Sequence, residues 1–149
     1  MKRATRNKLL VWVIFLGLLN FAVYTFFYWY FQGDAGNGFI RDGEYFLRGH
    51  FIHTADGRPS AVSRGVWIYS FIHSISIWPT IGVVLISMFI LARPHIIATI
   101  KSDALISGRT FVNLCMSLVA LVTLFSTIVF VVNLIQALSA ASAGRDYGL

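Results

Sequence analysis

Three long apolar segments constrain this chain more than any other feature of its sequence. Residues 9–31, 66–92 and 111–138 contain no Asp, Glu, Lys or Arg. Each is longer than the roughly 20 residues that a helix needs to cross about 30 Å of hydrocarbon. Backbone N–H and C=O groups find no water in that region, so they must pair within a helix. We therefore predict an all-α membrane protein, a bundle of three transmembrane helices.

The composition agrees with a membrane class. Hydrophobic residues make up 57% of the chain and charged residues only 12%, whereas a soluble domain is about one quarter charged. The net charge is +6, but the basic residues gather at the ends of the apolar segments and not on one face. Charges placed there contact anionic lipid headgroups. We expect the lipid bilayer, and not nucleic acid, as a partner.

The four basic residues within positions 1–8 raise the alternative of a cleaved secretory signal. The apolar core of such a signal is about 7 to 15 residues long and closes with small residues. Here the first apolar segment ends in YTFFYWYF, which is bulky to its last residue. We therefore expect a retained anchor.

The loops predict an orientation through their Lys and Arg residues, which favour the cytoplasmic side. With the N-terminus inside, residues 1–8 and the second loop, 93–110, hold seven of them. The first loop, 32–65, and the tail, 139–149, hold five. We predict a cytoplasmic N-terminus and an extracytoplasmic C-terminus. The short basic N-terminus and the compact loops favour a bacterial inner (plasma) membrane.

The first loop is the largest stretch outside the apolar segments. It opens with GDAGNG, which we expect to be flexible because it is rich in glycine. Residues 45–53 have the aromatic and β-branched content of a strand, and Asp56-Gly57 signals a turn. The pattern predicts a small β-hairpin with residues 60–63 as the return arm; a short helix lying on the membrane is the alternative. Ser63 is placed to cap a helix that begins near Arg64.

The second loop begins with Arg93-Pro94-His95. Apolar residues then recur on one helical face, which is typical of an amphipathic stretch lying in the membrane interface. We expect Gly108 to end this stretch. Thr110 is then the expected cap of the third helix.

His73 is the only ionisable side chain in the second apolar segment apart from tyrosine, roughly 10 Å below its outer end. Such a group normally faces protein or water. Tyr69 shares its helical face. Pro79 lacks an amide proton, so the helix bends there and hydroxyl groups can satisfy the freed carbonyl. The structural polar stripe that we predict around His73 consists of Ser70, Ser74, Pro79 and Thr80.

Three interpretations of His73 remain open. In the first, neutral His73 and the hydroxyl residues hydrogen-bond neighbouring helices. In the second, His73 is an axial ligand of haem b. The second histidine must then come from another copy or a partner, because the apolar segments contain no other. In the third, Tyr69 and His73 form a proton or quinone site.

His50 and His53 in the first loop form an H-x-x-H pattern, which places both rings on one face only if it is helical. A zinc or copper site there competes with the simpler interpretation of a solvated loop. Cys115 has no partner for a disulfide and is expected to pack as a small hydrophobic residue. We find no nucleophile elbow, no intramembrane carboxylate and no phosphate-binding loop.

These patterns favour a small integral membrane protein that is not an enzyme. We expect a non-catalytic accessory or assembly subunit of a larger membrane complex, with other membrane subunits or further copies of the chain as partners and no cofactor. The alternative is a cytochrome b-like or quinone-interacting redox subunit that uses His73.

Overall fold

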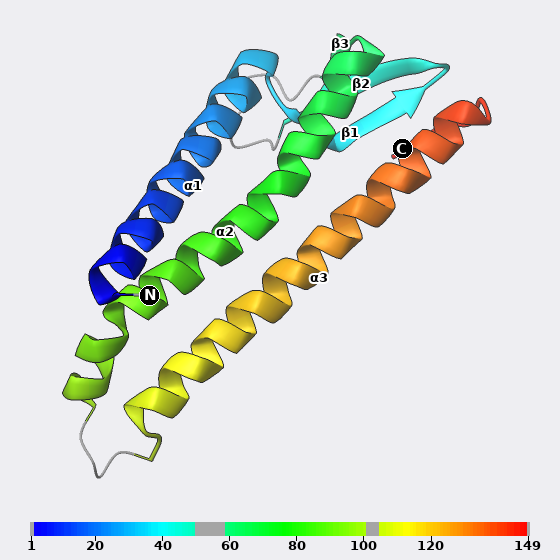
Figure 1. The fold of residues 1–149 in the computed structure, drawn as a ribbon. Coiled ribbons are helices and arrows are strands. Elements are labelled where there is room, and N and C mark those ends of the chain that lie inside the picture. Colours follow the sequence, from blue (N-terminus) through cyan, green and yellow to red (C-terminus); the bar gives the residue numbers. More distant parts are fainter. Residues whose placement is uncertain (1, 50–58, 101–104, 149) are drawn as a thin grey trace.

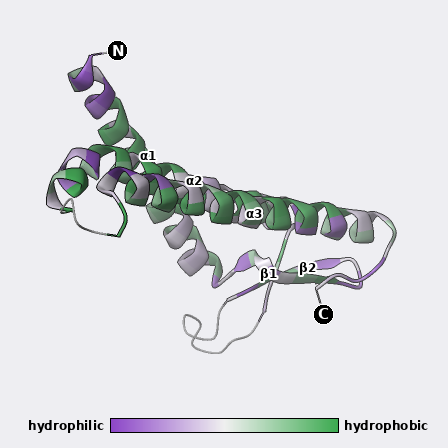
Figure 2. Ribbon diagram, turned by 90° about the horizontal axis from the view of Figure 1, so that it is seen from below, coloured by the Kyte–Doolittle hydropathy of each residue, from purple (hydrophilic) through white to green (hydrophobic). Residues whose placement is uncertain are grey.

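The computed structural model of the chain describes residues 2–49, 59–100 and 105–148. It is mostly helical and carries one small antiparallel sheet (Figure 1). All three helices are long and apolar enough to cross a membrane, which confirms the prediction of three such helices. Figure 2 shows the apolar residues along them. The elements in chain order are α1 (Arg3–Phe31), β1 (Asp34–Arg41), β2 (Glu44–Arg48), β3 (Ser60–Val62), α2 (Arg64–Thr99) and α3 (Gly108–Ser142).

The helices are not arranged as a closed bundle. Helix α2 lies between α1 and α3 and packs against both (Figure 1). Glycines allow close approach on each side: a Cβ atom at Gly82 would lie 2.6 Å from Oγ1 of Thr123 in α3, and one at Gly17 in α1 would overlap Val84. Small residues let membrane helices pack without a cavity between their backbones.

Helix α2 begins where the sequence predicts. The Oγ of Ser63 accepts a hydrogen bond from the amide of Val66 at 3.4 Å, so the helix starts at Arg64. Its end differs from the prediction, because the helix continues through Pro94 to Thr99. A proline removes only one intrahelical hydrogen bond, and α2 already contains Pro79. Of the predicted second loop, residues 93–99 are therefore helical, and residues 101–104 lie outside the described residues.

The cap of α3 is Ser107 and not Thr110. Its Oγ accepts from the amide of Thr110 at 3.2 Å and hydrogen-bonds the Thr110 hydroxyl at 2.9 Å. Gly108 begins this helix instead of ending a preceding one. A Cβ atom at Gly108 would lie 2.8 Å from the Cα of Ile97, so this glycine lets α3 start directly against the last turns of α2.

The sheet has the order β1-β2-β3 with both pairs antiparallel. Strand β2 pairs with β3 through Tyr45 opposite Val62, which agrees with the predicted hairpin strand and its return arm. Strand β2 ends at Arg48. The remainder of the predicted hairpin, including the Asp56-Gly57 turn, lies outside the described residues.

Strand β1 corrects the expectation of a flexible glycine-rich opening. It pairs with β2 across a two-residue turn in which Asp42 and Gly43 have φ values of 51° and 79°. Positive φ at both positions is typical of the tight turn that matches strand twist, and Asp-Gly is a preferred sequence for it. The pairing is irregular between Asp34 and Phe39. There a Cβ atom on Gly38 would overlap the carbonyl oxygen of Phe46, so the glycine content serves close strand approach.

The buried core lies where the sheet covers α2 and α3. Its fully buried large side chains come from β1, β2 and α2, namely Ile40, Leu47, Trp67 and Phe71. After α3 ends at Ser142, the tail turns back: Ile40 and Tyr147 exchange backbone hydrogen bonds of 2.8 and 2.9 Å. The C-terminus therefore lies beside β1, at the opposite end of the molecule from the N-terminus (Figure 1).

Candidate functional site between α1 and α2

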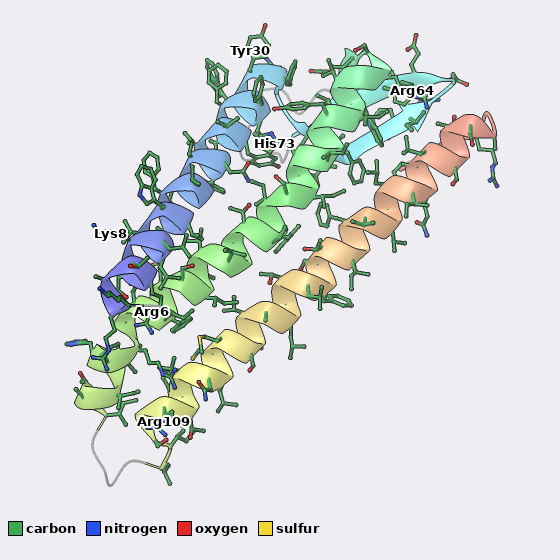
Figure 3. All side chains as sticks on the ribbon, viewed as in Figure 1. Arg6, Lys8, Tyr30, Arg64, His73 and Arg109 are labelled. Carbon is green, nitrogen blue, oxygen red and sulfur yellow. The ribbon has the colours of Figure 1, made fainter. Side chains whose placement is uncertain are left out.

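His73 lies on α2 facing α1 (Figure 3). Its Nδ1 is 3.2 Å from the hydroxyl of Tyr69, one turn earlier, and the ring of Tyr24 from α1 meets the imidazole edge-on at a centroid distance of 5.5 Å. A second edge-on contact, between Phe27 and Tyr69, holds the phenol. The Nε2 of His73 has no hydrogen-bond partner among the described residues. Tyr69 and Tyr24 thus orient the imidazole, and Phe27 holds Tyr69 in turn.

Asn20 makes the polar contact between the two helices. Its side-chain amide donates to Ser76 Oγ at 3.3 Å and to Thr80 Oγ1 at 3.1 Å. Both hydroxyls in turn donate within α2, Ser76 to the carbonyl of His73 and Thr80 to the carbonyl of Ser76, each at 2.7 Å. In the sequence Asn20 is one polar residue in an apolar run, and nothing there shows that it faces the stripe on α2. The pairing depends on how α1 and α2 are aligned.

Asp34 is the buried charged residue of the site, with 4% of its surface exposed. Gln32 adopts a left-handed conformation that ends α1. The following chain brings Asp34 back beside α1, where Tyr24 donates to its Oδ2 at 2.7 Å. The backbone and side-chain amides of Asn37 donate to Oδ1 at 2.8 and 3.0 Å. Sequence reasoning missed this residue, although an Asp followed three positions later by Asn is a known local hydrogen-bonding pattern.

The predicted polar stripe divides into two sides. Ser70 and Ser74 are both buried: Ser70 Oγ accepts from the amide of Ala35 in β1 at 3.1 Å, and Ser74 donates to the carbonyl of Ser70 at 3.0 Å. Thr80 instead faces Asn20, and Pro79 is exposed. Ser70 also lines a small cavity with Tyr24 of α1 and with His73, so the first side lies near α1 as well.

A groove of about 500 Å³ opens along one side of the α1–α2 contact; we call it the His73 groove. A second groove, of about 470 Å³, includes Pro79 and Thr80 in its lining and shares Leu16, Asn20 and Ser76 with the first. None of the residues that line either groove is charged. The His73 groove is lined by Leu16, Leu19, Asn20, Val23, Tyr69, Ile72, His73 and Ser76.

The predicted metal site at His50 and His53 lies outside the described residues. Within residues 2–49, 59–100 and 105–148, no three His, Cys, Asp or Glu side chains are grouped so as to hold a metal ion. Cys115 is a half-buried free thiol in α3.

Charged side chains, and the aromatic side chain of Tyr30, mark the two ends of the helices. Arg6, Lys8 and Arg109 lie at the end away from the sheet, whereas Tyr30 and Arg64 lie at the sheet end (Figure 3). His73 is nearer to the sheet end (Figure 3). The site therefore runs from the base of the sheet into the apolar length of α1 and α2.

Comparison of the sequence with protein-family models and with curated proteins, and comparison with solved structures, gives no match.

Proposed function

We propose that this protein is an integral membrane subunit that assembles with other membrane proteins and has no catalytic activity of its own. Its three helices cross the bilayer, and its sheet lies at one surface. The observation that carries the proposal is a long apolar stripe on α3 that faces away from α2.

The stripe consists of bulky residues spaced alternately four and three positions apart, which is the spacing of a helix–helix seam. Each has between 43% and 70% of its surface exposed. The face of α3 turned toward α2 is different, because it carries small and hydroxyl residues such as Thr123 at the close contact with Gly82. A bulky outer seam and a small inner one suit a helix that packs on both sides. The stripe residues are Leu114, Leu118, Leu121, Phe125, Ile128, Val132 and Ile135.

The charges support the orientation with a cytoplasmic N-terminus. The end away from the sheet holds Arg6, Lys8 and Arg109 (Figure 3) and, near the end of α2, Arg93. Positive residues favour the cytoplasmic side. The sheet and the C-terminus are then extracytoplasmic, as in a subunit of a bacterial inner membrane complex. Tags at the two termini that report the same compartment would contradict this orientation.

Affinity purification in mild detergent followed by mass spectrometry tests the assembly proposal. We expect one or more membrane proteins, or a differently tagged second copy, to co-purify with the wild type. Replacing Leu118 and Leu121 with alanine should reduce recovery of that partner roughly tenfold, because each truncation removes buried contact area. The matched control replaces Leu9 and Leu18 on α1, which are similarly exposed. Equal recovery with both variants would contradict the role of the stripe.

The second candidate function is a redox subunit that uses His73. It is favoured by the way Tyr69 and Tyr24 orient the imidazole while Nε2 stays available. For haem b, a second histidine would come from another copy or subunit. Absorption spectra of the purified protein with and without dithionite are expected to show a Soret band that is lost in His73→Ala. A colourless complex containing all its partners would rule out haem.

A further inference from the structure

We propose that the His73 groove binds the head group of a lipid-soluble quinone. This inference rests on the second candidate function and names its ligand class, and it is independent of assembly with other subunits. The groove opens on the side of the α1–α2 pair, so a molecule dissolved in the bilayer can enter it without crossing the protein.

The lining of the groove matches a flat, uncharged ring with polar edges. Its walls are apolar, from Leu16, Leu19, Val23 and Ile72, and polar groups project from both helices among them. Ligand sites are commonly built this way, with apolar walls and a few placed polar groups that fix orientation. A phospholipid headgroup is charged and would need a counter-charge, but no lining residue carries one.

The polar atoms available in the groove are complementary to a carbonyl and its reduced form. His73 Nε2 has no partner among the described residues, and neither does the side-chain carbonyl of Asn20, whose amide is engaged by Ser76 and Thr80. Polar atoms within the apolar length of a membrane helix cost free energy unless they are hydrogen-bonded. A bound quinol would satisfy both, because one of its hydroxyls can donate to the Asn20 carbonyl while the other donates to an unprotonated Nε2 of His73.

The Tyr69–His73 pair explains why a quinone, and not merely a carbonyl compound, fits. If the Tyr69 hydroxyl donates to Nδ1, then Nε2 carries the proton and donates to a quinone oxygen. If Nδ1 carries the proton and donates to Tyr69, then Nε2 accepts from a quinol hydroxyl. One histidine therefore serves both oxidation states by changing its tautomer. The edge-on contacts from Tyr24 and Phe27 hold the two rings in place for either arrangement.

Binding of decylubiquinone to the purified protein in detergent micelles tests the proposal. Equilibrium dialysis against a range of quinone concentrations should show one saturable site per chain above partitioning into empty micelles. His73→Phe, which keeps a ring of similar size, should weaken binding about tenfold through loss of one hydrogen bond to the ligand. Asn20→Leu should weaken binding of the reduced form, decylubiquinol, because only its hydroxyl can donate to the Asn20 carbonyl.

The matched control is His95→Phe, which changes an exposed imidazole near the other end of α2. Its binding should equal that of the wild type, and circular dichroism should show that all variants keep their helix content. Binding that is not saturable in the wild type, or that is equal in His73→Phe and His95→Phe, would overturn the proposal. The measurement uses the isolated chain, so loss of quinone binding in a chain that still recovers its partners would leave the assembly proposal standing.

Discussion

The two sides of α2 differ in how they pack. Toward α3, Gly82 meets Thr123, and the sheet covers the end of the contact with a buried core of Trp67 and Phe71. Toward α1, the contact is flanked by grooves, and in α1, which the structure describes throughout, no side chain is buried. Small and apolar groups hold the first contact, whereas the second combines the close approach of Gly17 to Val84 with hydrogen bonds from Asn20.

This difference separates a closely packed side of the molecule from the side on which we propose that a ligand binds. Close packing leaves no room for a ligand and makes a contact sensitive to added volume. Polar side chains beside an open groove leave hydrogen-bonding atoms that another molecule can satisfy. The α2–α3–sheet unit therefore acts as the scaffold, and α1 supplies the second wall of the site.

Adding one methyl group at each glycine contact should give the largest difference in stability between the two sides of α2. Gly82→Ala should lower the free energy of unfolding by about 2 kcal/mol, because its Cβ would crowd three side-chain atoms of Thr123, which is buried and bonded to its own helix. We expect Gly17→Ala to cost less, because the Val84 side chain that its Cβ would overlap lines a groove, so the two helices have space to adjust there. Denaturant titration in detergent, followed by circular dichroism, measures both.

Gly65→Ala is the control for helix propensity, because nothing lies within 4 Å of a Cβ at that position. It should not destabilise the protein. Equal losses for Gly82→Ala and Gly17→Ala would show that the two sides of α2 are packed alike.

The buried carboxylate should show a smaller effect confined to the α1 side. Asp34→Ala leaves the Tyr24 hydroxyl and the Asn37 amides without their acceptor, so we expect a loss of about 1 to 2 kcal/mol. Asp146→Ala, which removes an exposed acceptor from the amide of Asp42, is the matched control and should cost little. Hydrogen exchange should be faster near β1 in Asp34→Ala, while the centre of α3 stays protected. Acceleration throughout α3 would contradict a separate scaffold.

Tyr147 should give the smallest effect, at the sheet. Burial raises the pKa of its phenol above the usual value. The folded chain therefore binds this proton more tightly than the unfolded chain. The resulting stability is fully present below about pH 10 and is lost as the pH rises further, through the raised pKa. Comparing unfolding at pH 8 and pH 11 should show a smaller loss for Tyr147→Phe than for the wild type; identical losses would place Tyr147 outside the fold.

Local signals predicted much of the architecture. The three helices follow from runs of apolar residues too long for anything else, and the start of α2 follows from Ser63, whose hydroxyl acts within one turn. Strand β1 was missed although Asp42-Gly43 is a local hairpin signal, because the glycines before it suggested flexibility. The cap at Ser107 and the passage of α2 through Pro94 were also predicted wrongly. The Ser107 cap acts within one turn, as the Ser63 cap does, whereas the close contact of Gly108 with Ile97 joins residues in different helices and has no local signal.

The candidate site shows even more clearly that contacts between different helices could not be predicted from local sequence. Tyr69 and His73 lie one turn apart, so their hydrogen bond could be expected from helical spacing alone. Asn20 reaches Ser76 and Thr80 across two helices, and Asp34 reaches Tyr24 only because the chain reverses after Gln32. Such contacts depend on how the helices are aligned. The sequence does not determine that alignment, because each helix carries apolar residues on every face.

Length and hydrophobicity by themselves determined that this chain forms three helices able to cross a membrane, because an unpaired backbone in hydrocarbon is too costly for any alternative. Only the tertiary structure decided that α2 is central, that a sheet closes one end, and that His73 borders a groove, where its Nε2 has no partner among the residues that the structure describes. Those features depend on which faces of the helices pack together. A few glycines, and hydrogen bonds between residues far apart in the chain, determine that packing.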